Sequence, residues 1–262
     1  MVCDLVAEGS RMRAGLAIAA CACSAVVGCQ SAPRDTLTAP RILTTPYDAS
    51  SGDVLWAVVP IRNESGTTFV ERVNFADKLV AAAEEAQGIR VVPLNRTLGA
   101  MRALRMHGVH TPAEARKLAQ AMGVDGVLVG SVTAFDPYTP TIGVAVALYA
   151  RPGAMVGPRS SLTPRELATS PSDSIPAPQR FEDTPLASAS LHLDGKNHQV
   201  QMDLESFAQG RMRGASALGW KRYLASADLY AEFAAYRTVD ELLAQEWLRL
   251  ARTPPPAAGG VR

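Results

Sequence analysis

Four cysteines are the residues of this chain best suited to covalent chemistry, because a thiol can form a disulfide, bind a metal or carry a thioether. Cys3, Cys21, Cys23 and Cys29 all lie at the amino-terminal end of the 262-residue sequence. The rest of the chain has no cysteine, so neither a disulfide framework nor a thiolate metal site can form there. The thiol chemistry of the protein is therefore confined to its first segment.

The stretch around Cys29 predicts that this thiol carries a lipid. A charged Arg-Met-Arg at 11–13 precedes an apolar run at 14–28, which is shorter than the roughly 20 residues that span a bilayer. The sequence VVGC at 26–29 resembles the bacterial lipobox, in which apolar and small residues precede a cysteine. This resemblance implies thioether lipidation of Cys29, with palmitate as an added acyl chain, and cleavage after Gly28. A plain secretory signal and a chance cysteine are the alternatives.

Two neighbouring features extend this interpretation. The acidic residues upstream of Met12 are unusual in a signal peptide, which favours Met12 as the biological start. Gln30, rather than aspartate, follows the cysteine, and the lipobox resemblance then implies an outer-membrane location facing the periplasm. Residues 1–28 are therefore predicted to be a lipoprotein signal peptide, and acyl chains on Cys29 are predicted to anchor the mature protein to the membrane.

Proline and serine content divides the rest of the chain. Residues 29–52 have three prolines and many hydroxyl side chains, which predicts a flexible, lipid-anchored tether. Residues 151–185 have seven prolines, which predicts a disordered insertion, and residues 253–262 are expected to be a disordered tail. The segments with regular patterns are 53–150 and 186–252.

Residues 53–150 predict an α/β domain. Short apolar, valine-rich runs are expected to be strands at 53–61, 89–94, 125–135 and 141–150. Apolar residues at helical spacing predict helices at 69–87, 95–107 and 111–122. The resulting order, β-α-β-α-α-β-β, predicts a small mixed sheet with helices packed on it.

Several boundaries follow from local signals. Phe69 and Val73 are expected on the buried face of the first helix, and Asn95 is expected to cap the second. Thr111 begins the third with a capping box, because proline and glutamate follow at the required positions. Another capping box is expected to begin a helix at Thr238.

The region 186–252 is predicted to pack on the α/β domain. Two segments with alternating apolar and polar residues, 186–195 and 198–204, are expected to pair as a late hairpin. Residues 215–251 have helical periodicity and are expected to form a helical C-terminal extension.

Three stretches of the chain resemble a known family. They are VLWAVVPIRNESG at 54–66, FADKLVAAAEEAQGIRVVPLNR at 75–96 and EARKLAQAMGVDGVLVGSVTAF at 114–135. They are similar to the TolB amino-terminal-like domains of bacterial envelope lipoproteins, which include the CsgG and LpoB type. The resemblance implies a periplasmic α/β module that acts through protein contacts. Members include an activator of a peptidoglycan synthase, a secretion-channel subunit and a Tol-system component, whereas the insertion and helical C-terminus depart from the pattern.

Metal and phosphate sites are not indicated. His107 and His110 lie between two predicted helices, with no carboxylate or cysteine at ligand spacing. The glycine-rich residues 123–130 follow a helix and precede a strand, which is the reverse of the order in a phosphate-binding loop. We therefore expect no metal and no cofactor.

Catalytic serines and carboxylates are equally weak candidates. Ser65 and Ser131 lack the surrounding G-x-S-x-G motif of a nucleophile elbow. Asp53, Asp125 and Asp136 lie at predicted strand ends, where paired carboxylates could act, but such residues are also typical of turns. A non-enzymatic protein is therefore predicted, with an envelope hydrolase as one alternative.

Two polar loops, at 62–68 and 136–140, are the predicted protein-binding surface, because binding residues often lie on loops of a rigid domain. The candidate residues are Asn63, Glu64, Ser65, Asp136 and Tyr138. Tyr138 could either be exposed for binding or pack under its own turn.

The predicted function is that of a lipid-anchored envelope protein that binds or regulates another envelope protein. The net charge of +1 without a basic block argues against a nucleic-acid partner. Ahead of the envelope hydrolase, the first alternative is a homo-oligomeric secretion-channel subunit of the CsgG kind. That role would require membrane strands of roughly 9–11 residues.

Overall fold

The computed structural model describes most of the chain from the end of the predicted tether onward. The described residues are 42–48, 52–151, 154–155, 184–211 and 217–252. They all belong to one unit, Ala39–Arg262. The predicted signal peptide, its cleavage after Gly28 and the lipidation of Cys29 lie outside the described residues, as do most of the predicted insertion and the tail.

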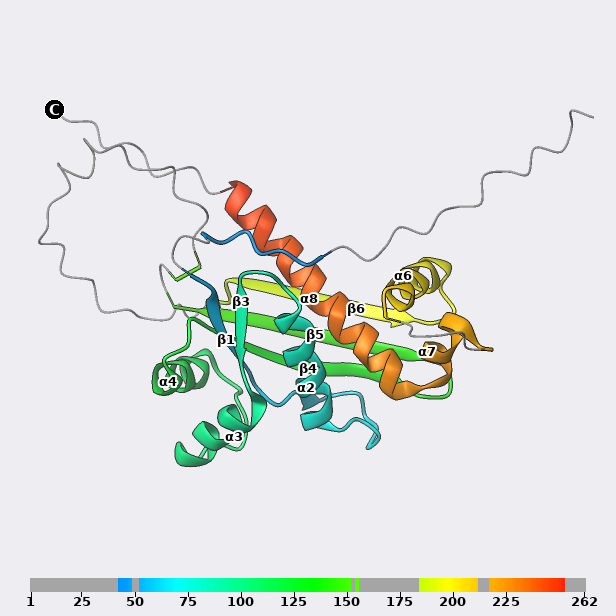
Figure 1. The fold of residues 1–262 in the computed structure, drawn as a ribbon. Coiled ribbons are helices and arrows are strands. Elements are labelled where there is room, and N and C mark those ends of the chain that lie inside the picture. Colours follow the sequence, from blue (N-terminus) through cyan, green and yellow to red (C-terminus); the bar gives the residue numbers. More distant parts are fainter. Residues whose placement is uncertain (1–41, 49–51, 152–153, 156–183, 212–216, 253–262) are drawn as a thin grey trace, which may run out of the picture. The chain divides into compact units, whose positions relative to one another are not determined.

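A single mixed sheet forms the centre of this unit (Figure 1). Its strands are β1 (Val54–Val58), β2 (Arg62–Asn63), β3 (Ile89–Val92), β4 (Gly126–Asp136), β5 (Thr141–Ala150) and β6 (Ala187–Asp194). The strand order is β3-β1-β4-β5-β6, and β2 pairs with β4 beyond the end of β1. Strands β1 to β4 pair in parallel, whereas β4, β5 and β6 pair antiparallel.

Helices cover both faces of the sheet. They are α2 (Arg72–Glu84), α3 (Leu94–Ala103), α4 (Pro112–Met122), α6 (His198–Gln209), α7 (Arg222–Ala225) and α8 (Ala227–Arg252), with a short 3-10 turn η2 (Gly219–Lys221) before α7. Helices α2 and α8 pack against each other over one face (Figure 1). Helices α3 and α4 pack on the opposite face, at the β1 end. The predicted α/β class with a small mixed sheet is confirmed.

Alternation along the strands supplies a core on each side of the sheet. On β1, Trp56 is fully buried beneath α2 and α8, while Ala57 is fully buried on the side of α3 and α4. On β4, Leu128 is buried on the side of α2 and α8, and Val127 is buried on the side of α3 and α4. Because successive side chains of a strand point to opposite faces, the valine-rich runs are explained by burial on both sides.

The capping box predicted at Thr111 is confirmed. The Glu114 backbone N–H donates to Thr111 Oγ1 at 3.2 Å, and the Thr111 N–H donates to Glu114 Oε2 at 3.1 Å. The His110 N–H also donates to this carboxylate at 2.7 Å. These backbone hydrogen bonds, with that from His110 the strongest, lower the pKa of Glu114 below its usual value.

The predicted late hairpin is wrong, because the segment at 198–204 is the first half of α6. Asn197 caps this helix, with its Oδ1 accepting from the Gln199 N–H at 2.8 Å. Val200, Leu204 and other buried residues then follow at helical spacing. A local cap and a buried stripe therefore override the alternating pattern, and β6 pairs with β5 instead.

Two helix starts also differ from the prediction. Helix α2 begins at Arg72, so Phe69 lies before it and is 63% exposed, and Val73 is 46% exposed. The stripe that begins at Phe75 already fills the interface with the sheet. Helix α3 begins one residue before Asn95, and no side chain caps it.

The capping box expected at Thr238 is wrong as well, because this residue lies in the middle of α8. Thr238 is buried, and its Oγ1 donates to the Ala234 carbonyl at 2.7 Å. Inside a continuous helix a threonine hydroxyl can donate a hydrogen bond to a backbone carbonyl one turn earlier. A capping sequence alone therefore does not start a helix.

The end of the predicted tether is packed rather than flexible. Residues 42–48, here called the strap, lie against α8 and the end of α2, and Leu43 and Tyr47 are buried. The Gln87 N–H donates to the Leu43 carbonyl at 2.9 Å, and the Thr45 N–H donates to the Gln87 carbonyl at 3.1 Å. The prediction of a flexible tether is therefore wrong for residues 42–48.

A buried carboxylate holds the strap on α8. Glu246 is fully buried and accepts a hydrogen bond from the Tyr47 hydroxyl at 3.1 Å. Arg249 donates to both Glu246 oxygens, at 2.9 and 2.8 Å, and also to the Met155 carbonyl at 2.8 Å. One ion pair thus joins the strap, the C-terminal helix and the chain just after β5.

Candidate protein-binding surface

The two predicted binding loops lie near each other at one end of the sheet. Strand β2 pairs with the second half of β4, with Asn63 opposite Val132. The Glu64 N–H continues this contact by donating to the Val132 carbonyl at 2.8 Å. Because β4 then runs into its turn with β5, the loop that follows β2 and the β4–β5 turn share this end of the sheet (Figure 1).

Asn63 and Ser65 shape the first loop rather than projecting from it. Asn63 Oδ1 accepts from the Ser65 N–H at 3.1 Å and from the Ser65 hydroxyl at 2.6 Å. Its amide also donates to the Thr67 carbonyl at 2.5 Å. Glu64 forms an exposed ion pair with Arg62 at 3.0 Å. The polar groups of two predicted binding residues are therefore used within the turn.

Asp136 performs the same task in the β4–β5 turn. Its Oδ1 accepts from the Tyr138 N–H at 2.9 Å and the Thr139 N–H at 3.2 Å, and its other oxygen accepts from the Thr139 hydroxyl. These bonds, chiefly that from the hydroxyl, lower the pKa of Asp136. The turn leaves the Tyr138 side chain 85% exposed, so packing beneath its own turn is excluded.

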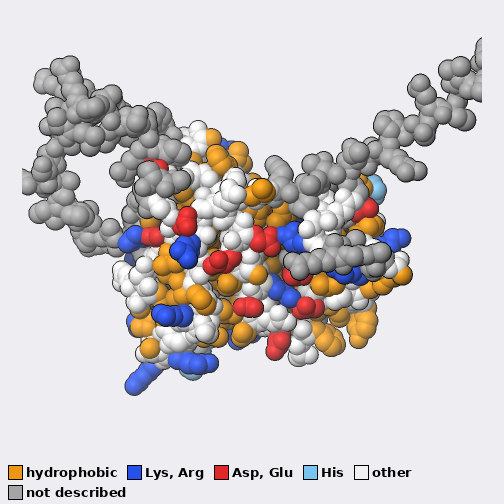
Figure 2. Space-filling model, viewed as in Figure 1, with side chains coloured by type: hydrophobic (Ala, Val, Ile, Leu, Met, Phe, Trp, Pro, Cys, Tyr) orange, Lys and Arg blue, Asp and Glu red, His pale blue; other side chains and the backbone are white. Residues whose placement is uncertain are grey.

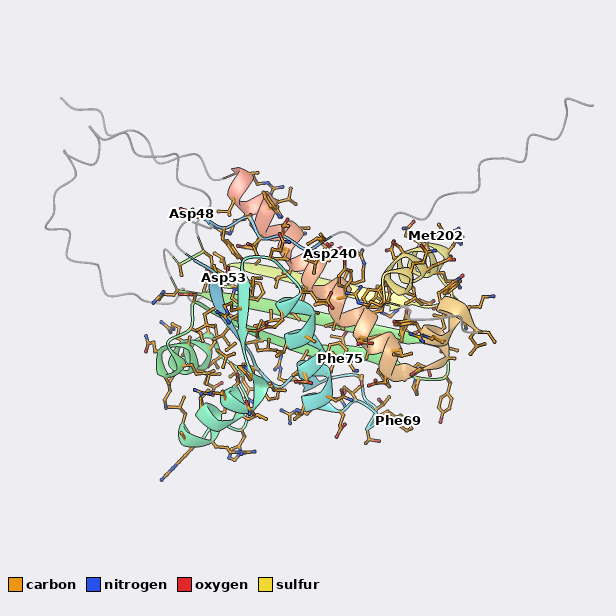
Figure 3. All side chains as sticks on the ribbon, viewed as in Figure 1. Asp48, Asp53, Phe69, Phe75, Met202 and Asp240 are labelled. Atoms are coloured by element: carbon orange, nitrogen blue, oxygen red, sulfur yellow. The ribbon has the colours of Figure 1, made fainter. Side chains whose placement is uncertain are left out.

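Phe69 is a residue of this surface that the sequence reasoning missed. It lines a groove of about 220 Å³ between the start of α2, the start of α8 and the end of β4. The apolar lining also includes Val70, Phe75, Phe135 and Ala231. Figure 3 places Phe69 on the turn before α2 and Phe75 on the helix. The missed signal was that the stripe from Phe75 onward already completes a buried helix face without Phe69.

Charged residues form one rim of the groove. Lys78 Nζ contacts Asp228 Oδ1 at 2.8 Å, and the Asn74 amide donates to the same oxygen at 3.4 Å. The lysine, foremost by its hydrogen bond, lowers the pKa of Asp228. We call the exposed Phe69 and Tyr138 side chains, together with this groove, the aromatic end. Hydrophobic side chains are visible along the corresponding lower right of Figure 2.

Of the candidate carboxylates, Asp53 and Asp125 precede the neighbouring parallel strands β1 and β4 at the same end of the sheet, whereas Asp136 lies at the other end. Asp125 and Asp136 flank opposite ends of the 11-residue strand β4, which separates them by about 35 Å. Asp125 accepts from the Leu55 N–H at 3.0 Å and pairs with Arg151, which is a structural role. Ser131 is buried in β4.

Within the described part of the chain, no three His, Cys, Asp or Glu side chains are grouped so that they could hold a metal ion. No helix in the described ranges has the length and apolar character needed to cross a membrane.

No family model and no curated protein matches this chain. Solved structures with a similar arrangement include the LpoB C-terminal domain from Salmonella enterica, with 12% identity, a TM-score of 0.36 and coverage of 58% of this chain and 85% of that one. Another is the lipoprotein GNA1162 from Neisseria meningitidis, with 19% identity, a TM-score of 0.33 and coverage of 55% and 84%. A third is the PelC dodecamer from Paraburkholderia phytofirmans, with 18% identity, a TM-score of 0.26 and coverage of 43% and 66%.

Proposed function

We propose that this protein is a non-enzymatic lipoprotein of the bacterial outer membrane that binds and regulates another envelope protein through its aromatic end. Acyl chains on Cys29 anchor it, and residues 30–41 connect the anchor to the strap. The signal sequence and lipobox support the location, while the arrangement of the two turns supports the binding role. The family resemblance of residues 54–135 points to the same kind of activity.

The observation that carries this proposal is a pair of exposed aromatic side chains at one end of the sheet: Phe69 lines the groove, and Tyr138 lies in the turn that follows Phe135 of the groove. Phe69 is 63% exposed and Tyr138 is 85% exposed, although large apolar side chains are usually buried. Aromatic residues contribute strongly to protein interfaces because they bury a large area with few rotatable bonds. The Asp136 side chain holds the Tyr138 backbone in place, which reduces the entropy lost on binding.

Site-specific photo-crosslinking in cells tests this surface directly. A photoreactive amino acid replaces Tyr138 or, separately, Phe69 in the full chain, and Arg102 on the exposed side of α3 serves as the control position. We expect adducts with the same envelope protein from both aromatic positions and none from position 102. Equal capture at all three positions would contradict the proposal. Adducts only between copies of this chain at positions 69 and 138 would favour the channel-subunit alternative.

Substitution of the same residues should weaken binding of the captured protein. Phe69→Ser and Tyr138→Ser are each expected to lower the affinity by roughly 2 kcal/mol, about 30-fold, which is typical of an interface hot spot. Leu248→Ser is the matched control, because Leu248 is an exposed apolar residue on α8, 47% accessible. Unchanged affinity in both aromatic variants, measured by titration calorimetry, would exclude this surface.

The anchor is tested separately by metabolic labelling with an alkyne-bearing palmitate analogue. We expect label on the full chain and its loss in Cys29→Ser, because the thioether requires this thiol. Cys23→Ser is the matched control, since that residue lies in the predicted leader, and it should retain the label. Persistent labelling of Cys29→Ser would show that another site carries the lipid.

A further inference from the structure

Strand β6 is an edge of the sheet. It pairs with β5 over eight consecutive residue pairs without a register shift, from Ala187 opposite Leu148 to Asp194 opposite Thr141. No other described strand pairs with its outer side (Figure 1). Helix α6 packs on the face covered by α8, where the ring centroids of Phe207 and Tyr236 are 5.0 Å apart.

The register shows which backbone groups of β6 point outward. The Gly195 N–H donates to the Pro140 carbonyl at 2.8 Å, which continues the ladder by one pair. Hydrogen-bonded pairs alternate in an antiparallel ladder, so the residues of β6 that bond to β5 are those at odd positions. The N–H and carbonyl groups of Ser188, Ser190 and His192 therefore point away from the sheet.

The other side of β5 confirms this alternation independently. The Arg151 N–H donates to the Asp125 carbonyl at 2.8 Å. The odd-numbered residues of β5 therefore form backbone hydrogen bonds with β4, and the even-numbered residues form them with β6. Among the described residues, no backbone hydrogen bond outside the β5 ladder uses the groups of Ser188, Ser190 or His192.

The side chains along this edge do not protect it. Ser188, Ser190 and His192 are exposed on the face opposite α2 and α8, and none has a formal charge when histidine is neutral. Natural edge strands are usually protected by lysine, proline or a bulge, because free backbone groups otherwise pair with another strand. The strand β6 has none of these from Ser188 to Asp194, and an irregularity is confined to its start, where the Leu186 N–H donates to the carbonyl of Leu148, the residue opposite Ala187.

We propose that β6 pairs antiparallel with β6 of a second copy of this chain, about a two-fold axis through Ser190. In this register Ser190 lies opposite Ser190 of the second copy, and Ser188 lies opposite His192 of the second copy. All three outward-facing residues then exchange both of their hydrogen bonds across the axis. A register centred on any other residue of β6 pairs fewer of them, so the pattern is self-complementary about Ser190.

The position of the strap explains why the occupant is a second copy. The axis is perpendicular to the sheet, so it keeps the α8 faces of both copies on the same side. Thr44 and Tyr47 contact α8 on this face, through the Thr44 carbonyl at 3.1 Å from Trp247 Nε1 and through Glu246. Both chains therefore enter from one side.

Two lipid-anchored chains require that both enter the dimer on the same side of the sheet, because their lipids insert into the same membrane. Residues 30–41 can extend about 40 Å, which is long enough for both anchors to reach one surface. Confinement to that surface also raises the effective concentration of one copy near another. This last step rests on the lipid anchor proposed above, whereas the hydrogen-bond pattern of β6 does not.

Single cysteines in the full chain test the register. In Ser190→Cys, the two thiol-bearing residues lie directly opposite, with Cα atoms about 5.5 Å apart. In Ser188→Cys or His192→Cys the equivalent residues are about 14 Å apart. A bifunctional thiol reagent too short to span that distance should link Ser190→Cys and the double variant S188C/H192C into dimers. It should not link either of the other single variants, and the unsubstituted chain measures background from its own cysteines.

Proline provides a second test that preserves the fold. The N–H of Ser190 points outward, so Ser190→Pro removes no hydrogen bond to β5 and is tolerated as proline is on other edge strands. We expect an unchanged far-UV circular dichroism spectrum together with loss of the dimer, measured by sedimentation in detergent. A monomeric parent chain, a dimer that survives Ser190→Pro, or equal crosslinking at 188 and 190 would each overturn the proposal. These results do not depend on whether Cys29 carries lipid, so a failed anchor is distinguished from a failed dimer.

Discussion

Replacing Glu246 with alanine is expected to lower the free energy of unfolding by about 3–5 kcal/mol, measured by urea denaturation. The carboxylate is fully buried, accepts from the Tyr47 hydroxyl and makes two hydrogen bonds with Arg249. Its removal takes the Glu246 counter-charge from the guanidinium and the hydrogen-bond acceptor from the Tyr47 hydroxyl. The loss of the buried partner is costly because the remaining charge is only partly hydrated, with the Arg249 side chain 27% exposed.

Two control variants locate the source of this effect. Glu232→Ala removes an exposed carboxylate from the same helix and should change stability by less than about 0.5 kcal/mol. Tyr47→Phe removes only one hydrogen bond and should cost about 1 kcal/mol. If Glu246→Ala were no more destabilising than Glu232→Ala, the strap would not depend on this ion pair.

Alkaline pH is expected to destabilise the protein through its buried tyrosines. Burial first, and then the Glu246 carboxylate, raises the pKa of Tyr47 well above the usual 10. Burial likewise raises the pKa of Tyr230, with a smaller contribution from Asp194. Above pH 10 these tyrosines lose their protons in the unfolded chain but keep them in the folded one. The unfolded state is then favoured, and stability falls as the pH rises.

The expected slope is about 1.4 kcal/mol per pH unit for Tyr47, beginning near pH 10. Below that pH both states hold the proton, so this residue contributes no pH dependence. Urea denaturation at a series of pH values measures the slope, and Tyr47→Phe should reduce it. Tyr138→Phe is the matched control, because it removes an exposed tyrosine hydroxyl instead of a buried one. Equal slopes in the two variants would show that Tyr47 ionises freely in the folded protein.

The sequence alone determined those features whose causes are local. The capping box at Thr111 was predictable because its donors and acceptors lie within four residues of one another. The strands β1, β4 and β5 were predictable because valine-rich runs bounded by turns favour buried strands. The lipobox is a contiguous motif, so the prediction at Cys29 also comes from sequence alone.

The binding surface was predictable only in part. The two polar loops were identified from turn residues, but Asn63, Ser65 and Asp136 proved to hold the turns together through their side chains. Phe69 was placed on a buried face because helical periodicity does not specify where a helix begins. Its exposure depends on which apolar residues the sheet and α8 accept, and only the packed structure decides that.

Tertiary structure alone decided the remaining features, because each depends on groups far apart in the chain. Tyr47 meets Glu246 across 199 residues, and neither local sequence indicates the other. The sequence predicted a hairpin after residue 186, whereas β6 pairs with β5 and 198–209 forms a helix that packs on α8. Strand register, burial of a charge and the outer edge of a sheet are properties of the assembled layers. They arise from long-range packing, which periodicity along the chain does not encode.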